Sequence, residues 1–266
     1  ISEKLTEAGF KAYLVGGCLR DLLLGREPKD WDIATDAKPQ EIQKLFPESV
    51  YENEFGTVGV KTDSKDATLK IIEITTFRKE GKYTDKRHPD KITFAETIEE
   101  DLARRDFTVN AIASEISGKK LVDPFGGEAD LKKKLIRAVG DPNERFEEDA
   151  LRVLRAVRFS AQLGFKIEEK TASAVKKSAG LLEFISKERI RDEFSKTLVT
   201  ENAAEGVTKL QEFGILKKIL PELEEGVGVG QNKHHIFTVF EHNRRSLEYA
   251  AQKNFPLDLR LASLLH

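Results

Sequence analysis

Two aspartates separated by one residue, Asp30 and Asp32, are the first side chains whose type and spacing suggest chemistry. If both lie on one extended strand, their carboxylates face the same way, with Cα atoms about 6.5 Å apart. Two carboxylates at that spacing can share the Mg²⁺ ions used in two-metal phosphoryl transfer. A polar strand edge or turn shows the same pattern, so the pair alone does not establish a site.

A double glycine upstream of the aspartates strengthens the catalytic interpretation. Gly16 and Gly17 follow a strand-like segment and open a helix-like one, with Arg20 one turn further on. Glycines let a phosphate chain approach the backbone, the N-terminus of a helix attracts negative charge, and arginine adds paired donors. An ordinary tight turn is the alternative. Together with the aspartates, the glycines predict a phosphate-binding turn.

These two segments resemble a known family. They read GGCLRD at residues 16–21 and DWDIAT at residues 30–35, which is similar to the pattern of class II tRNA CCA-adding enzymes and bacterial poly(A) polymerases. The family belongs to the polymerase β-like nucleotidyltransferases. The resemblance implies that Gly16, Gly17 and Arg20 hold a nucleoside triphosphate, and that Asp30 and Asp32 hold two Mg²⁺ ions.

Further motifs continue the resemblance in the same order. The segment IEITTFR at residues 72–78 resembles a strand with a further carboxylate, so Glu73 is a candidate third catalytic acid; a surface glutamate is the alternative. The segment RRDFTVNA at residues 104–111 resembles a motif that grips sugar and triphosphate. It implies nucleotide binding by Arg105, Asp106 and Asn110.

A helix-like segment after residue 140 carries charged side chains on one face. At about 100° per residue, Glu148, Asp149, Arg152 and Arg155 fall together, opposite an apolar face. Solvated ion pairs are the ordinary explanation. The resemblance implies instead that Asp149 and Arg152 read the base of CTP or ATP, with Arg155 and Arg158 as further nucleotide-binding residues. Guanine and uracil present a carbonyl where Asp149 needs a donor, and would leave that acceptor unpaired.

The elements that must position these residues fall into two groups. In the first 135 or so residues the sequence predicts strands at 11–15, 31–34, 57–62 and 69–77, and helices at 18–24 and 39–46. After residue 140 it predicts helices only, at 144–163, 171–182, 188–198, 202–213 and 237–252.

The resemblance implies the fold class. It is an α/β head of the polymerase β-like nucleotidyltransferase type, a small mixed β-sheet with helices, followed by an all-α neck and body. We expect a catalytic head at residues 1–138 and a helical neck for base recognition at 139–200. Residues 201–266 are expected to form a helical body, the start of a truncated HD-like domain.

Four of the five histidines lie after residue 230: His234, His235, His242 and His266. This region resembles the entry to an HD-type domain, which hydrolyses phosphate compounds with a metal held by histidine and aspartate. On that resemblance His242 is a first ligand and His266 begins the His-Asp pair. Ordinary core or surface histidines are the alternative.

The composition is typical of a globular protein. The 266 residues are 39% hydrophobic and 34% charged, with a net charge of −2 and no methionine. The single cysteine, Cys18, excludes a disulfide framework and favours the reducing cytoplasm. We find no apolar run of membrane-spanning length and expect no membrane partner. The oligomeric state is left open.

The expected function is template-independent addition of C and A to tRNA 3′ ends from CTP and ATP, with release of pyrophosphate. The alternatives are an A-adding tRNA enzyme, a poly(A) polymerase and, from another class, an HD-type phosphohydrolase or RNA-binding module. The polar segment 78–97 bears on the choice. It contains Tyr83, Arg87, His88 and Pro89, and it resembles the loop associated with adding the final A, which argues against a CC-only enzyme.

Overall fold

The computed structural model describes residues 1–51, 56–81, 92–115, 120–232 and 236–266. The chain divides into two compact units. The first comprises the described residues up to 133 together with 137–140, and the second comprises 134–136 and the described residues from 141 onward. The expected three-part division, with a neck that ends at residue 200, stays a prediction.

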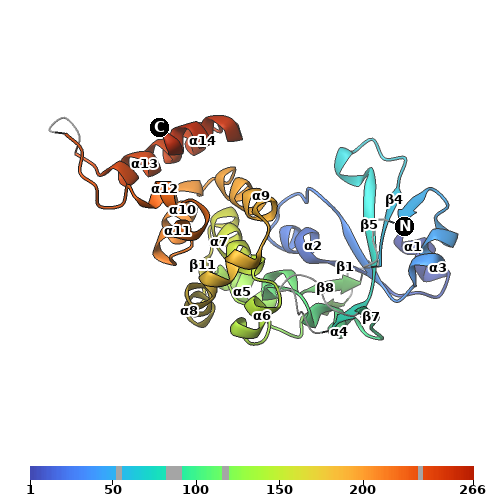
Figure 1. The fold of residues 1–266 in the computed structure, drawn as a ribbon. Coiled ribbons are helices and arrows are strands. Elements are labelled where there is room, and N and C mark those ends of the chain that lie inside the picture. The colour runs from blue at the N-terminus through green and yellow to red at the C-terminus, as the bar shows by residue number, and fades with distance from the viewer. Residues whose placement is uncertain (52–55, 82–91, 116–119, 233–235) are drawn as a thin grey trace. The chain divides into compact units, whose positions relative to one another are not determined.

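The first unit is built on a seven-stranded sheet (Figure 1). Its strands are β1 (Ala12–Val15), β2 (Asp32–Thr35), β3 (Ser49–Tyr51), β4 (Thr57–Lys61), β5 (Ile71–Thr76), β8 (Ala113–Glu115) and β9 (Leu121–Val122), in the order β3-β4-β5-β2-β1-β8-β9. Only β2 and β5 run parallel; the other neighbours are antiparallel. The sheet is therefore mixed, as the sequence predicts. A separate pair is formed by β6 (Arg78–Glu80) and β7 (Ile92–Phe94).

Both faces of this sheet are packed because residues along each strand alternate between them. Helices α1 (Ser2–Glu7) and α3 (Pro39–Leu45) cover one face, where Leu5 and Ile42 pack with Ile33 and Ile74. Helix α4 (Ile98–Ala103) contributes to the core on the other face, which includes Tyr13 and Phe77. Figure 1 shows α1 and α3 beside β4 and β5.

The strand register brings the phosphate-binding turn next to an aspartate. Strand β1 is antiparallel to β2 with Leu14 opposite Ile33, so the end of β1 lies beside Asp32 at the start of β2. Helix α2 (Gly16–Leu23) follows β1 directly, and Gly16 has φ +72°, a conformation that favours glycine. One prediction needs correction: β2 begins at Asp32, so Asp30 lies in the bend before the strand.

The second unit is helical apart from two short strands. Its helices are α6 (Pro142–Glu148), α7 (Leu151–Leu163), α8 (Glu169–Ser178), η3 (Ala179–Phe184), α9 (Lys187–Leu198), α10 (Ala203–Glu212), α11 (Leu216–Ile219), α12 (Pro221–Glu224), α13 (Val239–Gln252) and α14 (Leu257–Leu265). Two parallel strands of two residues each, β10 (Leu135–Ile136) and β11 (Lys166–Ile167), are the exception to the helix-only prediction. Among the described helices, none combines the length and apolar character that crossing a bilayer requires.

The single helix predicted over residues 144–163 is wrong, because the structure breaks it into α6 and α7. Asp149 has φ −132° and ψ 104°, an extended conformation. Its Oδ1 accepts a hydrogen bond of 3.1 Å from the backbone N–H of Leu151, the first residue of α7. An aspartate that bonds its neighbouring backbone in this way competes with the helical hydrogen bonds, and so ends one helix and starts the next.

Candidate active site

Two candidate catalytic acids of the first unit, Asp32 and Glu73, lie on neighbouring strands of the sheet. Asp32 in β2 is in register with Glu73 in the parallel strand β5, so the two side chains share a face. Burial raises the pKa of Asp32, with the nearby charge of Arg105 lowering it and that of Asp30 raising it further.

The donor set fits a hard divalent cation. Asp30, Asp32 and Glu73 offer carboxylate oxygens only, which Mg²⁺ prefers, and Mg²⁺ usually takes one or two carboxylates together with substrate phosphate oxygens. Within the described ranges, no three histidine, cysteine or acidic side chains are already gathered around one point. Glu73 is thus a neighbour of Asp32 in register rather than part of a preformed cluster.

The first glycine of the turn lies against this acid. A Cβ added to Gly16 would meet Nη1 of Arg105 at 2.7 Å and Oδ2 of Asp32 at 3.4 Å. Backbone, cation and carboxylate therefore meet at one place, and a side chain there would collide with the arginine. Gly17 faces more open space, where a Cβ would lie 3.7 Å from Nη2 of Arg20. Glycine is therefore required at position 16, whereas a Cβ at position 17 would make only an ordinary contact.

The other predicted nucleotide-binding residues of this unit form one hydrogen-bonded chain. Arg20, which is buried, donates from Nη1 to the side-chain oxygen of Asn110 at 2.8 Å. Asn110 in turn donates to Asp106 at 3.2 Å. Arg20 also pairs with Asp21 at 2.8 Å. Residues 90 positions apart in the chain are thus brought together on the same unit as Asp32.

Sequence reasoning missed Asp101, the acid that anchors two neighbouring arginines. Asp101 is fully buried; Nη2 of Arg104 donates to its Oδ1 at 2.9 Å, and Arg105 lies 3.6 Å from its Oδ2. Burial raises the pKa of Asp101, but the charges of Arg104 and Arg105 outweigh it and hold the pKa below the usual value. Asp101 lies in the last turn of α4 and the arginines follow that helix, so their spacing of three and four residues could have indicated these pairs.

The proposed base-reading residues lie in the second unit, each held by partners. Arg152 donates from Nη1 to Glu148 at 2.6 Å and to the backbone oxygen of Arg145 at 3.1 Å. Asp149 accepts at Oδ2 from Nη2 of Arg189 at 3.2 Å. No local sequence pattern predicts a contact between Arg189 and Asp149, because 40 residues separate them.

Two other predicted nucleotide-binding residues make contacts within the helices. Arg158 donates from Nε to Glu193 at 2.6 Å, and its guanidinium lies 4.0 Å from the ring centre of Phe159. Glu193 is only 3% exposed. Arg155 lies 5.3 Å from the same ring. Arg158 therefore joins α7 to α9 through a buried ion pair, a contact that the predicted nucleotide role did not anticipate.

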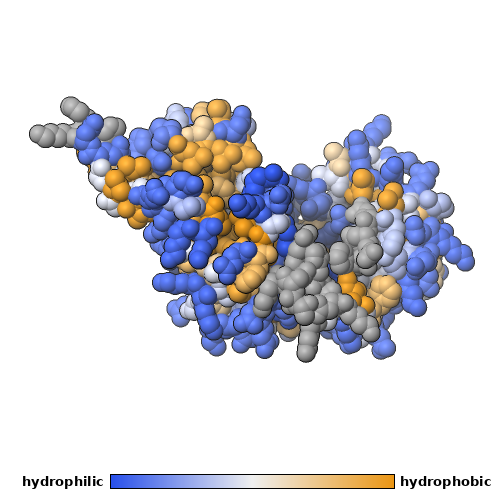
Figure 2. Space-filling model, viewed as in Figure 1, coloured by the Kyte–Doolittle hydropathy of each residue, from blue (hydrophilic) through white to orange (hydrophobic). Residues whose placement is uncertain are grey.

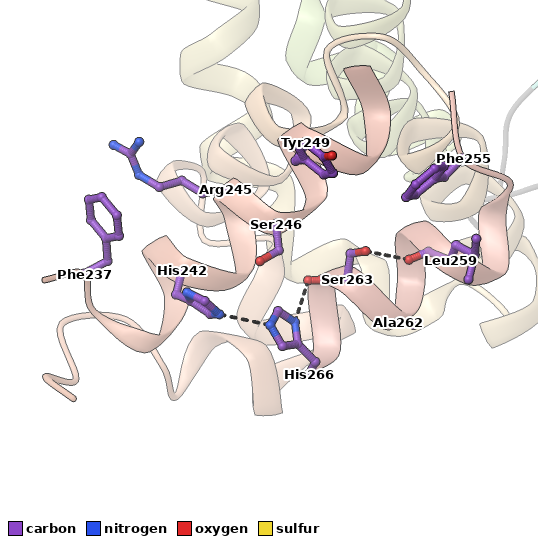
Figure 3. Close-up of a pocket in the computed structure, with 10 residues that line it drawn as sticks. All are labelled: Phe237, His242, Arg245, Ser246, Tyr249, Phe255, Leu259, Ala262, Ser263 and His266. Atoms are coloured by element: carbon purple, nitrogen blue, oxygen red, sulfur yellow. Dashed lines mark hydrogen bonds between the residues drawn. The ribbon is translucent and has the colours of Figure 1, made fainter. Parts of the chain in front are cut away.

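Two of the late histidines meet beside a hollow between α13 and α14 (Figure 3). Nε2 of His242 lies 3.0 Å from Nε2 of His266. The hollow has a volume of about 610 Å³ and is bordered by aromatic side chains that include Tyr249 and Phe255. Figure 2 shows apolar surface gathered on the helical part of the chain. His234 and His235 lie outside the described residues.

The loop predicted over residues 78–97 for adding the final A is described only at its ends, which form the paired strands β6 and β7, and its middle lies outside the described residues. Tyr83, Arg87, His88 and Pro89 all belong to residues 82–91. The argument against a CC-only enzyme therefore stays a prediction from the sequence.

Comparison with known families identifies both units. Residues 12–137 match the family described as the poly A polymerase head domain. Residues 164–226 match the family described as the probable RNA and SrmB-binding site of polymerase A.

Two relatives of similar sequence are both CCA-adding enzymes. The CCA-adding enzyme of Lactococcus lactis subsp. lactis (strain IL1403) is 50% identical over 226 residues, which are 85% of this chain and 56% of that protein. The CCA-adding enzyme of Ligilactobacillus salivarius (strain UCC118) is 51% identical over 214 residues, 80% of this chain and 51% of that protein. The chain thus spans about half the length of the curated relatives it matches.

Solved structures agree in fold. A Bacillus stearothermophilus CCA-adding enzyme in complex with CTP aligns with a TM-score of 0.76 at 40% identity, covering 85% of this chain and 54% of that one. A tRNA nucleotidyltransferase with a primer tRNA and an incoming ATP analogue aligns with a TM-score of 0.75 at 28% identity, covering 99% of this chain and 73% of that one.

Proposed function

This chain belongs to the family of class II CCA-adding enzymes and bacterial poly(A) polymerases, and on that premise we propose that it extends tRNA 3′ ends with C and A from CTP and ATP. In each addition the terminal 3′ hydroxyl attacks the α-phosphate of the nucleotide. A new phosphodiester bond forms, the bond to the β-phosphate breaks, and pyrophosphate leaves. The hydroxyl proton passes to solvent.

The observation that carries this proposal is the meeting of Gly16, Arg105 and Asp32 where β1 ends beside the start of β2. A glycine backbone and an arginine suit a triphosphate, and a partly buried carboxylate beside them suits a divalent cation. Asp30 and Asp32 would hold Mg²⁺, and the ion would supply charge that favours attack by the hydroxyl and departure of pyrophosphate. Glu73 is the candidate third acid because of its register with Asp32.

The remaining roles follow from the side-chain chemistry. Arg20 and Arg105 would bind the triphosphate, while Asp106 and Asn110, which are hydrogen-bonded to one another, would bind the sugar. All four side chains have partners and are mostly buried, so they lose little conformational freedom when the nucleotide binds.

Base selection is assigned to the second unit. Asp149 would accept from the amino group that cytosine and adenine share, and Arg152 would donate to the neighbouring ring acceptor. Arg155 is a further candidate near the bound nucleotide. Arg158 is a weaker one, because its buried ion pair with Glu193 already accounts for its guanidinium. A protein that acts on tRNA in this way fits the cytoplasm, where the buried thiol of Cys18 would stay reduced.

One observation favours a second activity. The 3.0 Å approach of His242 and His266 is compatible with two imidazoles that share one metal ion, as the HD-type interpretation requires. Within the described residues no acid completes that site. Phosphohydrolase activity therefore ranks below the transferase proposal.

A primer-extension assay tests the proposed function. Transcripts of tRNA that end before CCA, after C and after CC are each given single nucleotides and Mg²⁺ with the complete protein. We expect C on the first two and A on the last, with UTP and GTP refused. Addition of A alone to the CC-ended tRNA would make the protein an A-adding enzyme, and long A tails on any RNA a poly(A) polymerase. No incorporation would refute the transferase proposal.

A further inference from the structure

The carboxylate of Asp149 is held by two donors from different elements. Its Oδ1 accepts from the backbone of Leu151, and its Oδ2 accepts from Arg189 on α9. Helices α7 and α9 are packed neighbours in this unit (Figure 1). A carboxylate held through one oxygen can still turn about its bond to Cβ, whereas bonds to both oxygens fix its plane. Each oxygen has two lone pairs, so one direction on each remains for a ligand.

The guanidinium of Arg189 makes few polar contacts apart from the one with Asp149 within the described residues. Its Nη1 is buried and has no hydrogen-bond acceptor among the described residues. The bond from Nη2 to Asp149 is the one that the described residues provide for this side chain. The side chain is 25% exposed, and the free energy that its partial burial costs is offset by the paired carboxylate of Asp149. The contact with Asp149 is therefore the reason for Arg189 to lie where it does.

The second base-reading residue has its own separate anchors. The side chain of Arg152 is held by Glu148 and by the carbonyl of Arg145, whereas the carboxylate of Asp149 is held by Leu151 and Arg189. The acceptor and donor side chains are thus oriented by different partners, although the backbones of Asp149 and Arg152 are hydrogen-bonded within the same turn. Loss of Arg189 should loosen the acceptor and leave the donor in place.

We propose that Arg189 is a positioning residue that sets base selectivity through Asp149. This inference rests on the proposed function and deepens it. With Arg189 present, the free lone pairs of Asp149 point in one fixed direction, toward an amino donor. Without it the carboxylate can rotate away from a uracil or guanine carbonyl, so the wrong base no longer forces an unpaired contact.

Matched variants of α9 test the inference. Arg189→Gln and Arg189→Met remove the charge and keep most of the side chain. As a control, Arg191→Gln removes an exposed arginine whose ion pair, within the described part of the chain, is with its neighbour Asp192. The measurement is kcat/KM for CTP and for UTP on tRNA that ends before CCA. We expect the CTP-to-UTP preference to fall by about tenfold or more in both Arg189 variants, since a charge-assisted hydrogen bond contributes on that order. Arg191→Gln should keep the wild-type preference.

A double-variant cycle separates positioning from a general structural effect. If Arg189 acts through Asp149, adding Arg189→Gln to Asp149→Asn should change the CTP-to-UTP preference no further. An additional loss of the same size in the double variant would overturn the inference.

The two proposals fail in different ways. A wild-type protein that incorporates no nucleotide contradicts the proposed function. A selective wild-type protein whose folded Arg189→Gln and Arg189→Met variants are equally selective contradicts only the role of Arg189. Thermal unfolding shows which variants are folded. If one of the two replacements of Arg189 fails to fold, the other still tests the inference.

Discussion

At the scale of single residues, the first unit holds its arginines in place without a ligand. Arg20 is fixed by Asp21 and Asn110. Arg105 pairs with Asp101, and its Nη1 lies beside Gly16, next to the carboxylate of Asp32. Side chains oriented in advance stabilise a charged transition state without reorganising during the reaction. The orphaned Nε of Arg105, buried without an acceptor in the described structure, is a donor that a phosphate oxygen would satisfy.

Removing the anchor of these arginines should destabilise the first unit. In Asp101→Asn the buried charges of Arg104 and Arg105 lose their common partner, which should lower the free energy of unfolding by about 3 kcal/mol. Urea unfolding measures the change. Asp192→Asn, which removes an exposed acid, should change it by less than about 0.5 kcal/mol. Equal effects of the two substitutions would contradict the anchoring role.

The same residue predicts a dependence of stability on pH. The pKa of Asp101 is lower in the folded protein than in the unfolded chain, so the unfolded chain binds the proton more readily. Its contribution to stability is complete above the ordinary aspartate pKa and is lost as the pH falls through the folded value. Unfolding midpoints of wild type and Asp101→Asn should therefore converge as the pH falls below about 4. A constant difference down to low pH would rule out this linkage.

At the scale of elements, close packing links a glycine to the nucleotide site. Helix α5 (Gly127–Lys133) begins against the short 3₁₀ helix Thr108–Asn110. A Cβ at Gly127 would overlap the backbone oxygen of Thr108 and would lie 2.7 Å from Cγ1 of Ile112. Since Asn110 accepts from Arg20, a shift of this segment would reach the arginine.

A pair of alanine substitutions tests that link. Gly127→Ala should lower the free energy of unfolding by about 1–3 kcal/mol, because backbone must move to admit the methyl group. Gly180→Ala, at a position where a Cβ meets nothing within 4 Å, should be neutral or slightly stabilising. Calorimetry of both variants, with CTP affinity measured alongside, checks the prediction. A tolerated Gly127→Ala would show that α5 is not packed as described.

Local patterns predicted the elements better than the breaks between them. The strands near residues 57–62 and 69–77 followed from β-rich runs, and these strands and the one predicted at 11–15 are present with small shifts. The break at Asp149 was missed because apolar periodicity continues through it, whereas the bond from Leu151 to its carboxylate is visible only in three dimensions. Asp30 was also misplaced: it was predicted to share a strand with Asp32, but strand β2 begins two residues later.

At the scale of the whole molecule, the candidate residues divide between two units. The triphosphate and metal candidates belong to the first unit, and the base-reading candidates to the second. Short motifs predicted both sets. They could not predict partners distant in sequence, such as Arg20 with Asn110 or Asp149 with Arg189, because nothing in a local pattern encodes which helix packs beside which.

The most direct test of the account is the rate of AMP addition to CC-ended tRNA by Asp32→Asn, compared with Asp63→Asn. Asp63 is an exposed acid of the same unit, so its substitution should leave the rate unchanged. We predict that Asp32→Asn stays folded but loses activity by roughly 100-fold or more, because its carboxylate would hold the divalent cation that stabilises the leaving group. A folded Asp32→Asn protein that adds AMP at the wild-type rate would contradict the catalytic assignment of this site.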